Sequence, residues 1–506
     1  MHGYDYWLTS VFLDNRGPVI DMLRDLTLRC GITLFALSIS LTTSAAETPN
    51  IVVILADDLG YGDLACYNPH SKIPTPHIDA LAKAGMRFTN AYSAAAVCVP
   101  SRYSLMTGRY PFRGAPLRWG ARPTIEKGRA TVASLLKSRG YETACVGKWH
   151  CGFNGGVKDQ TKPLTGGPMD RGFDHFFGQH GSLDQPPYFY IRDRRAVQPA
   201  TIPIAESHEE GLSIVYQGRF WRAGKVAPNF KHEEVLERYA GEAMSFLEDH
   251  HRRAAKKPFF LYCALTAPHG PWLPGKQFAG KSKAGTMGDF VVHVDDVVGR
   301  LLLTLKELQY DKNTLVVFSS DNGPLWFDPD VKHFGHDSSG GLRGRKGDIW
   351  EGGIRMPLIA RWPGKVARGS TTDEIAGLVD VLATCAAVVG EKLPTDAGVD
   401  SVSLLPVMLG KHRDKPVRDS IVLQSLGPND LAIRQGDWKY IPWIGSGGFL
   451  TKPKRVKPAA GEATGQLYNL KSDPGEQKNL FLQLPEIVAH LSKQLEQQRG
   501  STRTRR

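Results

Sequence analysis

The chain has 506 residues, of which 41% are hydrophobic and 23% are charged, and its formal net charge is +12. Its length exceeds one ordinary hydrophobic core and its composition is that of a soluble globular protein, which excludes a disordered or fibrous chain. Beyond the N-terminus no segment approaches the ~20 apolar residues that span a bilayer, so stable membrane insertion is not expected. The positive charge favours a polyanionic partner, but the basic residues are scattered and no nucleic-acid-binding motif accompanies them, so nucleic acid is not expected.

Residues 1–46 are predicted to be an N-terminal extension that carries an export signal. Two arginines precede an apolar run at residues 32–41 and small residues follow it, which favours cleavage near Ala45 or Ala46. The stretch before Met22 holds three acidic residues and one arginine, unlike the start of a signal peptide, which makes Met22 a candidate for the true start. The alternative is a buried N-terminal helix. We therefore expect an exported protein, periplasmic or extracellular after cleavage.

Two kinds of apolar pattern alternate along the rest of the chain. Short β-branched runs, typical of buried parallel strands, occupy residues 50–56, 142–146, 259–265 and 314–319. Helical patterns occupy residues 78–84, 131–139, 233–250 and 290–308. After about residue 410 there are shorter extended pieces and a final helix, at residues 421–424, 431–433, 438–441 and 484–498. The alternation predicts an α/β domain followed by a small α+β domain.

Each predicted strand of the larger domain is followed by polar residues. These residues are Asp57 and Asp58, Lys148 and His150, His269, and Asp321 and Asn322. Open α/β sheets build their binding sites at the carboxyl ends of their strands, so we expect these side chains to lie together. Carboxylate and amide oxygens can hold a metal ion, and lysine and histidine can hold an anion.

The segment from Cys98 to Arg102 reads CVPSR, and Thr107 and Gly108 complete the pattern C-x-P-S-R-x4-T-G. With this string the chain resembles the type I, formylglycine-dependent sulfatases, an arylsulfatase-like family of the alkaline-phosphatase superfamily. In that family the string directs a maturation enzyme to oxidise the cysteine to formylglycine during export. The resemblance extends from Asn50 to about residue 480.

The resemblance implies a fold and a division of the chain. The implied fold is α/β, with a large mixed, mostly parallel sheet sandwiched between helices and a small C-terminal α+β domain that contains an antiparallel sheet. The catalytic domain would span residues 47–410, and the C-terminal subdomain would span residues 411–506.

A sulfate ester is anionic and has a poor leaving group, so its hydrolysis needs a strong nucleophile together with charge neutralisation. A hydrated aldehyde made from Cys98 meets the first need, because one geminal hydroxyl can attack sulfur and loss of the other hydroxyl's proton then expels sulfate. The cation should be a hard, redox-inert ion bound by oxygen. By resemblance it is one calcium ion, held by Asp57, Asp58, Asp321, Asn322 and the residue at position 98.

Cationic and proton-transfer residues at family motif positions complete the expected site. By resemblance, Arg102 and Lys148 hold the oxygens of formylglycine and of sulfate. His150, in GKWHCG, helps to deprotonate the hydrated aldehyde, which an imidazole can do near neutral pH. Lys346, in GLRGRKG, and His269, in APHGPW, bind the ester and protonate the leaving oxygen.

Residues outside these motifs are expected to support the site and to recognise the substrate. Ser182, in GQHGSLDQ, is a further candidate for substrate binding, and residues 350–353 (WEGG) are predicted to shape the loop of Lys346. Segments 153–232 and 324–340 are the predicted specificity regions. Their candidates for stacking on sugar rings and attracting sulfated chains are Tyr188, Phe189, Tyr190, Arg192, Arg194, Arg195 and Trp221. The alternative is that these residues pack ordinary loops.

The predicted substrate is a sulfated small molecule or glycan: an aryl sulfate or, in preference, a carbohydrate sulfate. Two other functions stay open. A formylglycine-dependent phosphonate monoester or phosphodiester hydrolase would share the superfamily and most of the metal site. A non-catalytic protein that binds sulfated glycans would instead keep Cys98 unmodified. Rates on matched aryl esters test the first alternative, and mass spectrometry of the peptide that contains Cys98 tests the second.

Overall fold

The computed structural model describes residues 48–114, 122–208, 220–411 and 414–505. The predicted N-terminal extension, with its candidate start at Met22 and its cleavage site near Ala45 or Ala46, lies outside these residues. From Thr48 onward the chain belongs to one compact unit. Among the helices of the described ranges, none has both the length and the apolar character that crossing a bilayer requires.

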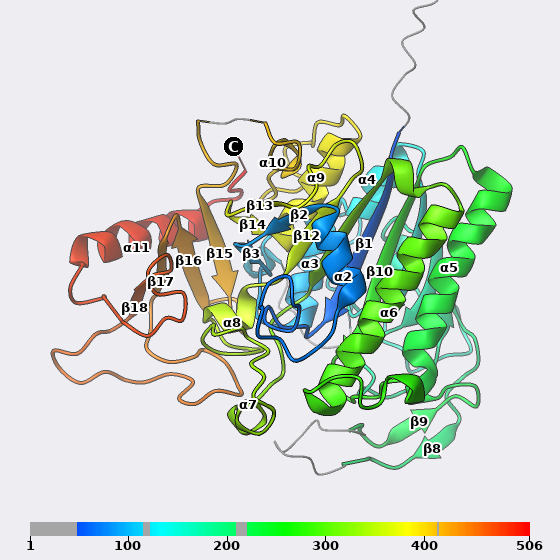
Figure 1. The fold of residues 1–506 in the computed structure, drawn as a ribbon, viewed down its shortest axis with the longest axis horizontal. Helices are drawn as coiled ribbons and strands as arrows, with labels where there is room; N and C mark the ends of the chain where they lie inside the picture. The colour runs from blue at the N-terminus through cyan, green and yellow to red at the C-terminus, as the bar shows by residue number, and fades with distance from the viewer. Residues whose placement is uncertain (1–47, 115–121, 209–219, 412–413, 506) are drawn as a thin grey trace, which may run out of the picture. The chain divides into compact units, whose positions relative to one another are not determined.

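A ten-stranded mixed sheet forms the centre of this unit (Figure 1). The strand order is β13-β2-β12-β11-β1-β10-β4-β5-β6-β7, and the run from β11 to β5 is parallel throughout. Antiparallel pairs flank this run on both sides. The predicted mostly parallel sheet is therefore confirmed. The strands are β1 (Asn50–Asp57), β2 (Met86–Phe88), β4 (Glu142–Lys148), β5 (His175–Gln179), β6 (Ile191–Arg192), β7 (Arg195–Ala196), β10 (Phe259–Pro268), β11 (Thr314–Ser320), β12 (Leu358–Arg361) and β13 (Ser370–Thr372).

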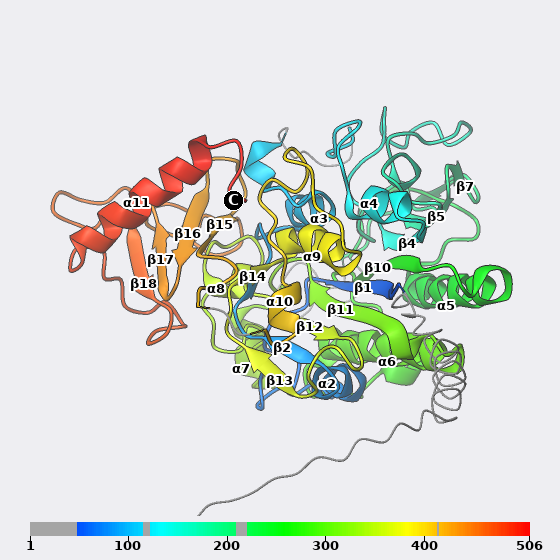
Figure 2. The ribbon, with the colours of Figure 1, turned by 90° about the horizontal axis from the view of Figure 1, so that it is seen from above.

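Strand β1 lies in the middle of the sheet. Residues 51–56 are at most 1% exposed, because β10 and β11 pair with the two edges of β1 and helices cover both faces of the sheet (Figure 2). A strand covered on both faces is apolar at consecutive positions rather than at alternate ones, which explains the sequence NIVVILAD. Ile51 lies opposite Phe260 of β10 and Leu315 of β11. The register with β10 shifts between Leu55 and Asp57, and after this shift Asp57 lies beside Pro268. The three strands therefore end close together.

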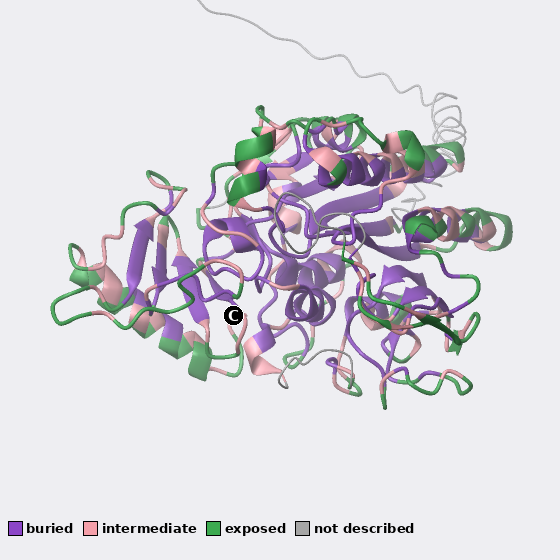
Figure 3. Cartoon of the chain, turned by 90° about the horizontal axis from the view of Figure 1, so that it is seen from below, coloured by how far each residue is buried: buried purple, intermediate pink, exposed green. Residues whose placement is uncertain are grey.

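Helices cover both faces of the large sheet (Figure 2). On one face lie α2 (Pro76–Lys83), α5 (Val235–Ala254) and α6 (Gly285–Glu307), and both α5 and α6 contact β10. On the other face lie α3 (Cys98–Thr107), α4 (Val132–Ser138) and α9 (Val381–Val388), which contact one another. Figure 3 shows that α5 and α6 are buried toward the sheet and exposed on their outer sides, whereas α3 is buried along its whole length. The predicted helices are confirmed. The remaining short ones are α7 (Asp328–Phe334), α8 (Glu351–Ile354) and α10 (Leu405–Met408).

A second, antiparallel sheet follows, with strand order β15-β16-β17-β18. Helix α11 (Pro485–Gly500) contacts β16 and β17. The strands share one apolar core with Tyr92, Ile349 and Trp350, which precede them in the chain. The predicted C-terminal antiparallel sheet and final helix are thus confirmed. The strands are β15 (Ser420–Gln424), β16 (Leu431–Gln435), β17 (Trp438–Ile441) and β18 (Gln466–Asn469).

Short pairings complete the fold and were not predicted. Strand β3 (Ala91–Tyr92) pairs with β14 (Ala376–Gly377), and β8 (Ile202–Ile204) pairs with β9 (Gly224–Val226). Segments of two or three residues are too short for a periodic pattern to develop, so tertiary contacts decide their conformation.

Candidate active site

Four neighbouring strands of the large sheet end at one place. Strand β1 ends at Asp57 and β4 at Lys148, while His269 and Asp321 directly follow β10 and β11. This arrangement follows from the order β11-β1-β10-β4, in which all four strands run parallel. The predicted convergence of polar residues at the carboxyl ends of these strands is confirmed.

The backbone bends sharply at two of the strand ends. Asp58 has a φ of 62° and His150 has a φ of 54°, in the left-handed region that residues with a side chain rarely adopt. Such a conformation costs about 1–3 kcal/mol, so the surrounding packing has to impose it. Conformations of this kind concentrate at functional sites, because they direct side chains where a regular strand would not.

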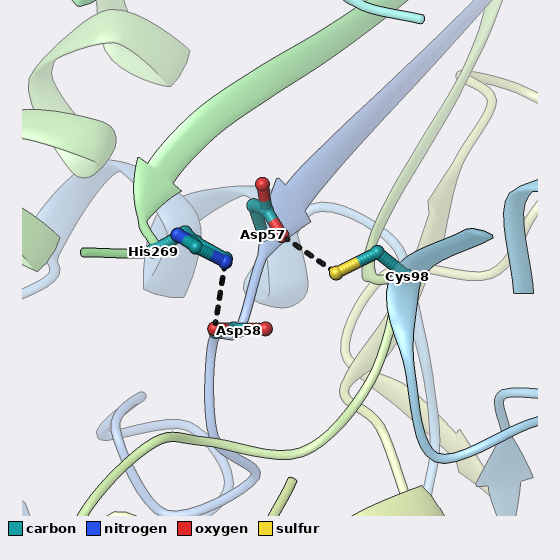
Figure 4. A group of neighbouring side chains, drawn as sticks. All are labelled: Asp57, Asp58, Cys98 and His269. Atoms are coloured by element: carbon teal, nitrogen blue, oxygen red, sulfur yellow. Dashed lines mark hydrogen bonds and ion pairs between the residues drawn. The ribbon is translucent and has the colours of Figure 1, made fainter. Parts of the chain in front are cut away.

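Cys98 is the first residue of α3 and is 5% exposed. Its Sγ lies 3.5 Å from Oδ1 of Asp57, and Nε2 of His269 lies 3.8 Å from Oδ2 of Asp58 (Figure 4). One potential ligand atom from each of these four residues lies within 4.8 Å of the others. The amino end of a helix carries a partial positive charge, which favours an anion next to position 98.

Each aspartate at the end of β1 has a lysine partner. Nζ of Lys148 donates to Oδ2 of Asp57 at 2.5 Å, and Nζ of Lys346 donates to Oδ2 of Asp58 at 2.7 Å. Lys148 is fully buried and Lys346 is 9% exposed. Lysines from two distant segments therefore converge on the two neighbouring carboxylates at the end of β1.

Arg102 joins α3 to β11 and β4. Its Nε donates to Oδ2 of Asp321 at 2.9 Å, and its Nη1 donates to the carbonyl of Lys148 at 3.0 Å. With the two lysine pairs, three aspartates face three cations, so their formal charges cancel. A divalent cation added to this cluster would make it positive and would attract an anionic ester.

Asp321 and Asn322 approach the same carboxylates. The backbone N–H of Asp58 donates to Oδ1 of Asp321 at 3.2 Å, and Nδ2 of Asn322 donates to Oδ1 of Asp58 at 2.6 Å. Oδ1 of Asn322 is buried and has no hydrogen-bond partner among the described residues. A buried amide oxygen without a donor is costly, and a bound cation would satisfy it. The predicted oxygen ligands therefore fit a hard divalent ion such as calcium.

Burial and charge set the protonation of the site. Burial opposes the ionisation of Asp57, but the cations around it, Lys148 first, lower its pKa below the usual value. Burial, helped by the charge of Asp321, raises the pKa of the Cys98 thiol, so the unmodified cysteine stays protonated near neutral pH. Burial and the nearby Lys148 lower the pKa of His150, so this imidazole is neutral near neutral pH.

The loop that carries Lys346 is fixed by backbone hydrogen bonds. The N–H of Lys346 donates to the carbonyl of Pro324 at 2.9 Å, and the N–H of Gly352 donates to the carbonyl of Arg343 at 2.7 Å. The guanidinium carbon of Arg343 lies 3.8 Å from the ring centre of Trp350. Residues 350–353 thus close the loop on itself, which agrees with their predicted structural role.

Ser182 lies on the loop that follows β5, beside the end of β4. The N–H of His150 donates to the carbonyl of His180 at 3.1 Å, which joins the two loops. Ser182 is 2% exposed, and its hydroxyl has no hydrogen-bond partner in the described ranges. Across the same ranges no hydrogen bond or ion pair joins Ser182 to Cys98 or to the aspartates of β1. Its part in substrate binding stays a prediction.

The aromatic residues that were predicted to stack on sugar rings are core residues instead. Tyr188, Phe189 and Tyr190 are at most 4% exposed, so their interpretation as a sugar platform is wrong. A run of aromatic residues is equally what a buried core requires, and sequence alone does not separate the two cases. Three of the remaining candidates have partners within the protein: Trp221 stacks on His232, Arg192 pairs with Glu242, and Arg194 pairs with Asp170. The fourth, Arg195, is exposed.

A buried aspartate that the sequence analysis did not single out braces the turn after β1. Asp63 is fully buried, and its Oδ2 accepts the N–H of Gly60 at 2.7 Å. Its Oδ1 lies 2.9 Å from Nε2 of His336 and also accepts the hydroxyl of Ser338. The available signal was an acidic residue at the end of the glycine-rich run DDLGYGD. His336, in a predicted specificity segment, therefore has a structural partner.

A buried, charge-balanced cluster at the carboxyl ends of parallel strands, with a cysteine at a helix start, is suited to the hydrolysis of an anionic ester. The chain matches the sequence model of the family described as Sulfatase over residues 49–391. It belongs to the sulfatase family and is a sulfuric ester hydrolase.

Individual relatives extend this assignment over most of the chain. It is 36% identical over 490 residues to an N-acetylgalactosamine-6-O-sulfatase of Bacteroides thetaiotaomicron, an alignment that covers 89% of this chain and 93% of that protein. It is 35% identical over 461 residues to human arylsulfatase A, with 88% and 86% covered. A solved structure described under the metabolism of multiple glycosaminoglycans by Bacteroides thetaiotaomicron has a TM-score of 0.77 and 34% identity, and the match covers 90% of this chain and 100% of that chain.

Proposed function

We propose that the chain removes the 6-O-sulfate group of N-acetylgalactosamine in a carbohydrate. The nucleophile would be formylglycine at position 98. The position of Cys98 carries the proposal: a buried residue at the start of α3, 3.5 Å from Asp57. A thiol whose pKa is raised by burial is a weak nucleophile, whereas the hydrate of an aldehyde would place an oxygen nucleophile there. The sugar is inferred from the bacterial relative that shares 36% of its residues with this chain.

The metal ligands in this proposal are Asp57, Asp58, Asp321, Asn322 and an oxygen of residue 98. The buried, unpartnered Oδ1 of Asn322 supports this set, and its hard oxygens suit calcium. When bound, such an ion neutralises charge on the ester and on the nucleophile.

The other residues of the site fall into two groups: one near residue 98 and the sulfate group, and one near the leaving oxygen of the ester. Arg102 and Lys148 are proposed to hold the oxygens of residue 98 and of sulfate, and neutral His150 to accept a proton from the hydrated aldehyde. Lys346 and His269 lie beside Asp58, where they are proposed to bind the ester and protonate the leaving oxygen. Ser182 is kept as a substrate-binding candidate because its buried hydroxyl lacks a partner among the described residues.

The proposal includes a maturation step and export. An enzyme that generates formylglycine would oxidise Cys98, and the segment up to Ala45 or Ala46 would direct the chain to the periplasm or the exterior. Residues 47–410 would form the catalytic domain, and residues 411–506 would form the C-terminal subdomain. N-terminal sequencing of secreted protein tests the cleavage site.

The deciding experiment uses protein produced with a competent maturation system. Mass spectrometry of the peptide that contains Cys98 should show the aldehyde. Sulfate release should be faster from N-acetylgalactosamine 6-sulfate than from 4-nitrophenyl sulfate, and faster than the hydrolysis of a matched aryl phosphodiester. Cys98→Ala should release no sulfate. An intact thiol in an active enzyme would refute the nucleophile, and activity confined to aryl sulfate would refute the sugar.

A further inference from the structure

The loop between β17 and β18, orange in Figure 1, is fastened to the loop of Lys346. The N–H of Ile349 donates to the carbonyl of Ser446 at 2.8 Å, and the hydroxyl of Thr451 donates to Oδ2 of Asp348 at 2.5 Å. The hydroxyl of Ser446 in turn donates to the carbonyl of Thr451 at 2.6 Å, which closes the turn between them. This loop is therefore bonded to residues two and three positions after Lys346.

Phe449 stands at the tip of this turn and is 45% exposed. A Cβ added at Gly347 would lie 2.8 Å from Cε1 of Phe449, so the ring packs against the glycine that follows Lys346. Nζ of Lys346 reaches Asp58 in the site at 2.7 Å. A large apolar ring that stays half exposed on an anchored turn is available to stack on a ligand, since packing holds only one edge of it.

The same loop is strongly basic. The segment from Pro442 to Gly461 contains four basic residues and no acidic residue. Arg455 stacks on the ring of Trp443 and pairs with Asp430. The three lysines, by contrast, are exposed, and across the described ranges no ion pair engages them: Lys452, Lys454 and Lys457. They give this side of the site a positive field that an anionic chain would feel.

We propose that Phe449, Lys452 and Lys454 form a second subsite, which binds the anionic sugar next to the one that carries the scissile sulfate. The inference rests on the proposed function, since it assigns a neighbour to the sugar held by Lys346. The ligand is a sulfated or carboxylated oligosaccharide: one sugar ring stacks on Phe449, and its acidic groups meet the two lysines. The target sugar alone would not reach this surface, so the subsite selects for chain length.

The test compares two substrates of the matured enzyme, N-acetylgalactosamine 6-sulfate and a chondroitin 6-sulfate tetrasaccharide. Phe449→Ala should raise KM for the tetrasaccharide about tenfold, and Lys452→Ala/Lys454→Ala should raise it about fivefold and weaken its salt dependence. For the monosaccharide both variants should stay within about twofold of the parent. The matched control is Lys256→Ala/Lys257→Ala, a pair of exposed lysines just before β10, at the opposite end of that strand, which should change neither substrate.

Equal effects on the two substrates, or an equal effect of the control pair, would overturn the subsite. Tetrasaccharide binding to the Cys98→Ala chain, measured by calorimetry, gives a second readout that needs no turnover. It should weaken by the same factors in the Phe449 and lysine variants. Binding that weakens in this way while the matured enzyme hydrolyses neither sugar would retain the subsite and refute the proposed function. If the variants bind the tetrasaccharide as tightly as the parent and the matured enzyme hydrolyses both sugars, the subsite is refuted and the proposed function is retained.

Discussion

Replacing Lys439 with methionine should destabilise the fold, and by more near pH 8 than near pH 5. Nζ of Lys439, on β17, lies 2.9 Å from Oε1 of Glu351 and 2.9 Å from Oε1 of Glu476. All three side chains are 0% exposed. Glu351 begins α8, directly after the loop of Lys346, so this cluster joins the C-terminal sheet to the edge of the site.

The magnitude follows from the charges that the substitution leaves behind. Removing one partner of a buried ion pair costs about 3–5 kcal/mol, because a buried charge loses its compensation. Glu351 keeps a second cation, since Nε of Arg355 donates to its Oε2 at 2.6 Å. Within the described residues Glu476 has no other ion pair, so it bears most of the cost when ionised. Near pH 8 we therefore expect a loss of about 3–5 kcal/mol.

The pH dependence comes from Glu476. Burial, and then the charge of Glu351, raise its pKa from 4.5 to about 7 against the opposing effect of Lys439. Because the folded pKa lies above the unfolded one, stability falls as the pH rises from about 4.5 to about 7. Loss of Lys439 raises the folded pKa further and extends this fall to higher pH. Near pH 5 Glu476 is protonated with or without the lysine, so the variant should lose less there.

Urea unfolding followed by tryptophan fluorescence, at about pH 5 and about pH 8, measures both values. Lys231→Met is the control, because the ion pair that Lys231 forms with Glu234, 2.7 Å apart, is exposed, so its loss should leave stability almost unchanged. Glu476→Gln should flatten the pH dependence, because it removes the titrating group and keeps an acceptor for the N–H of Glu351. A cost for Lys439→Met that is the same at both pH values would refute this reasoning.

Three further results are expected. Arg102→Lys should lower stability by about 2 kcal/mol in thermal or urea unfolding, because a lysine keeps the charge but not both the bond to Asp321 and the bond to the Lys148 carbonyl; an unchanged midpoint would contradict it. Dialysis against a chelator should lower the thermal midpoint, and calcium at about 100 times its Kd should restore about 2.7 kcal/mol. In Asn322→Leu the calcium-dependent part of that shift should shrink, and a full shift would argue against Asn322 as a ligand. Asp63→Asn should lower the free energy of unfolding by about 1–3 kcal/mol, since the buried acceptor of His336 and Ser338 is weakened; a neutral effect would show that Asp63 does not brace the turn.

The sequence predicted best what depends on consecutive residues. Strands such as β1 are apolar at consecutive positions, so their place and the polar residues at their ends were predictable. It predicted worst what depends on long-range packing. Nothing local distinguishes Tyr188, which is buried, from Phe449, which is half exposed, because both are aromatic residues in loop-rich segments. The buried partnership of Lys439 with two glutamates likewise joins residues too far apart for any local pattern.

The position of β1 has a consequence for synthesis. Its two neighbours begin only at Phe259 and Thr314, so the ribosome makes more than 200 further residues before either edge of β1 can pair. Until then an eight-residue strand of almost purely apolar character has two open edges, the type of segment that joins other chains. A nascent chain that stops before β11 would leave one edge open permanently. The molecule is therefore most vulnerable to aggregation while it is being made. Chaperones that shield residues 50–57 would protect the chain during this period.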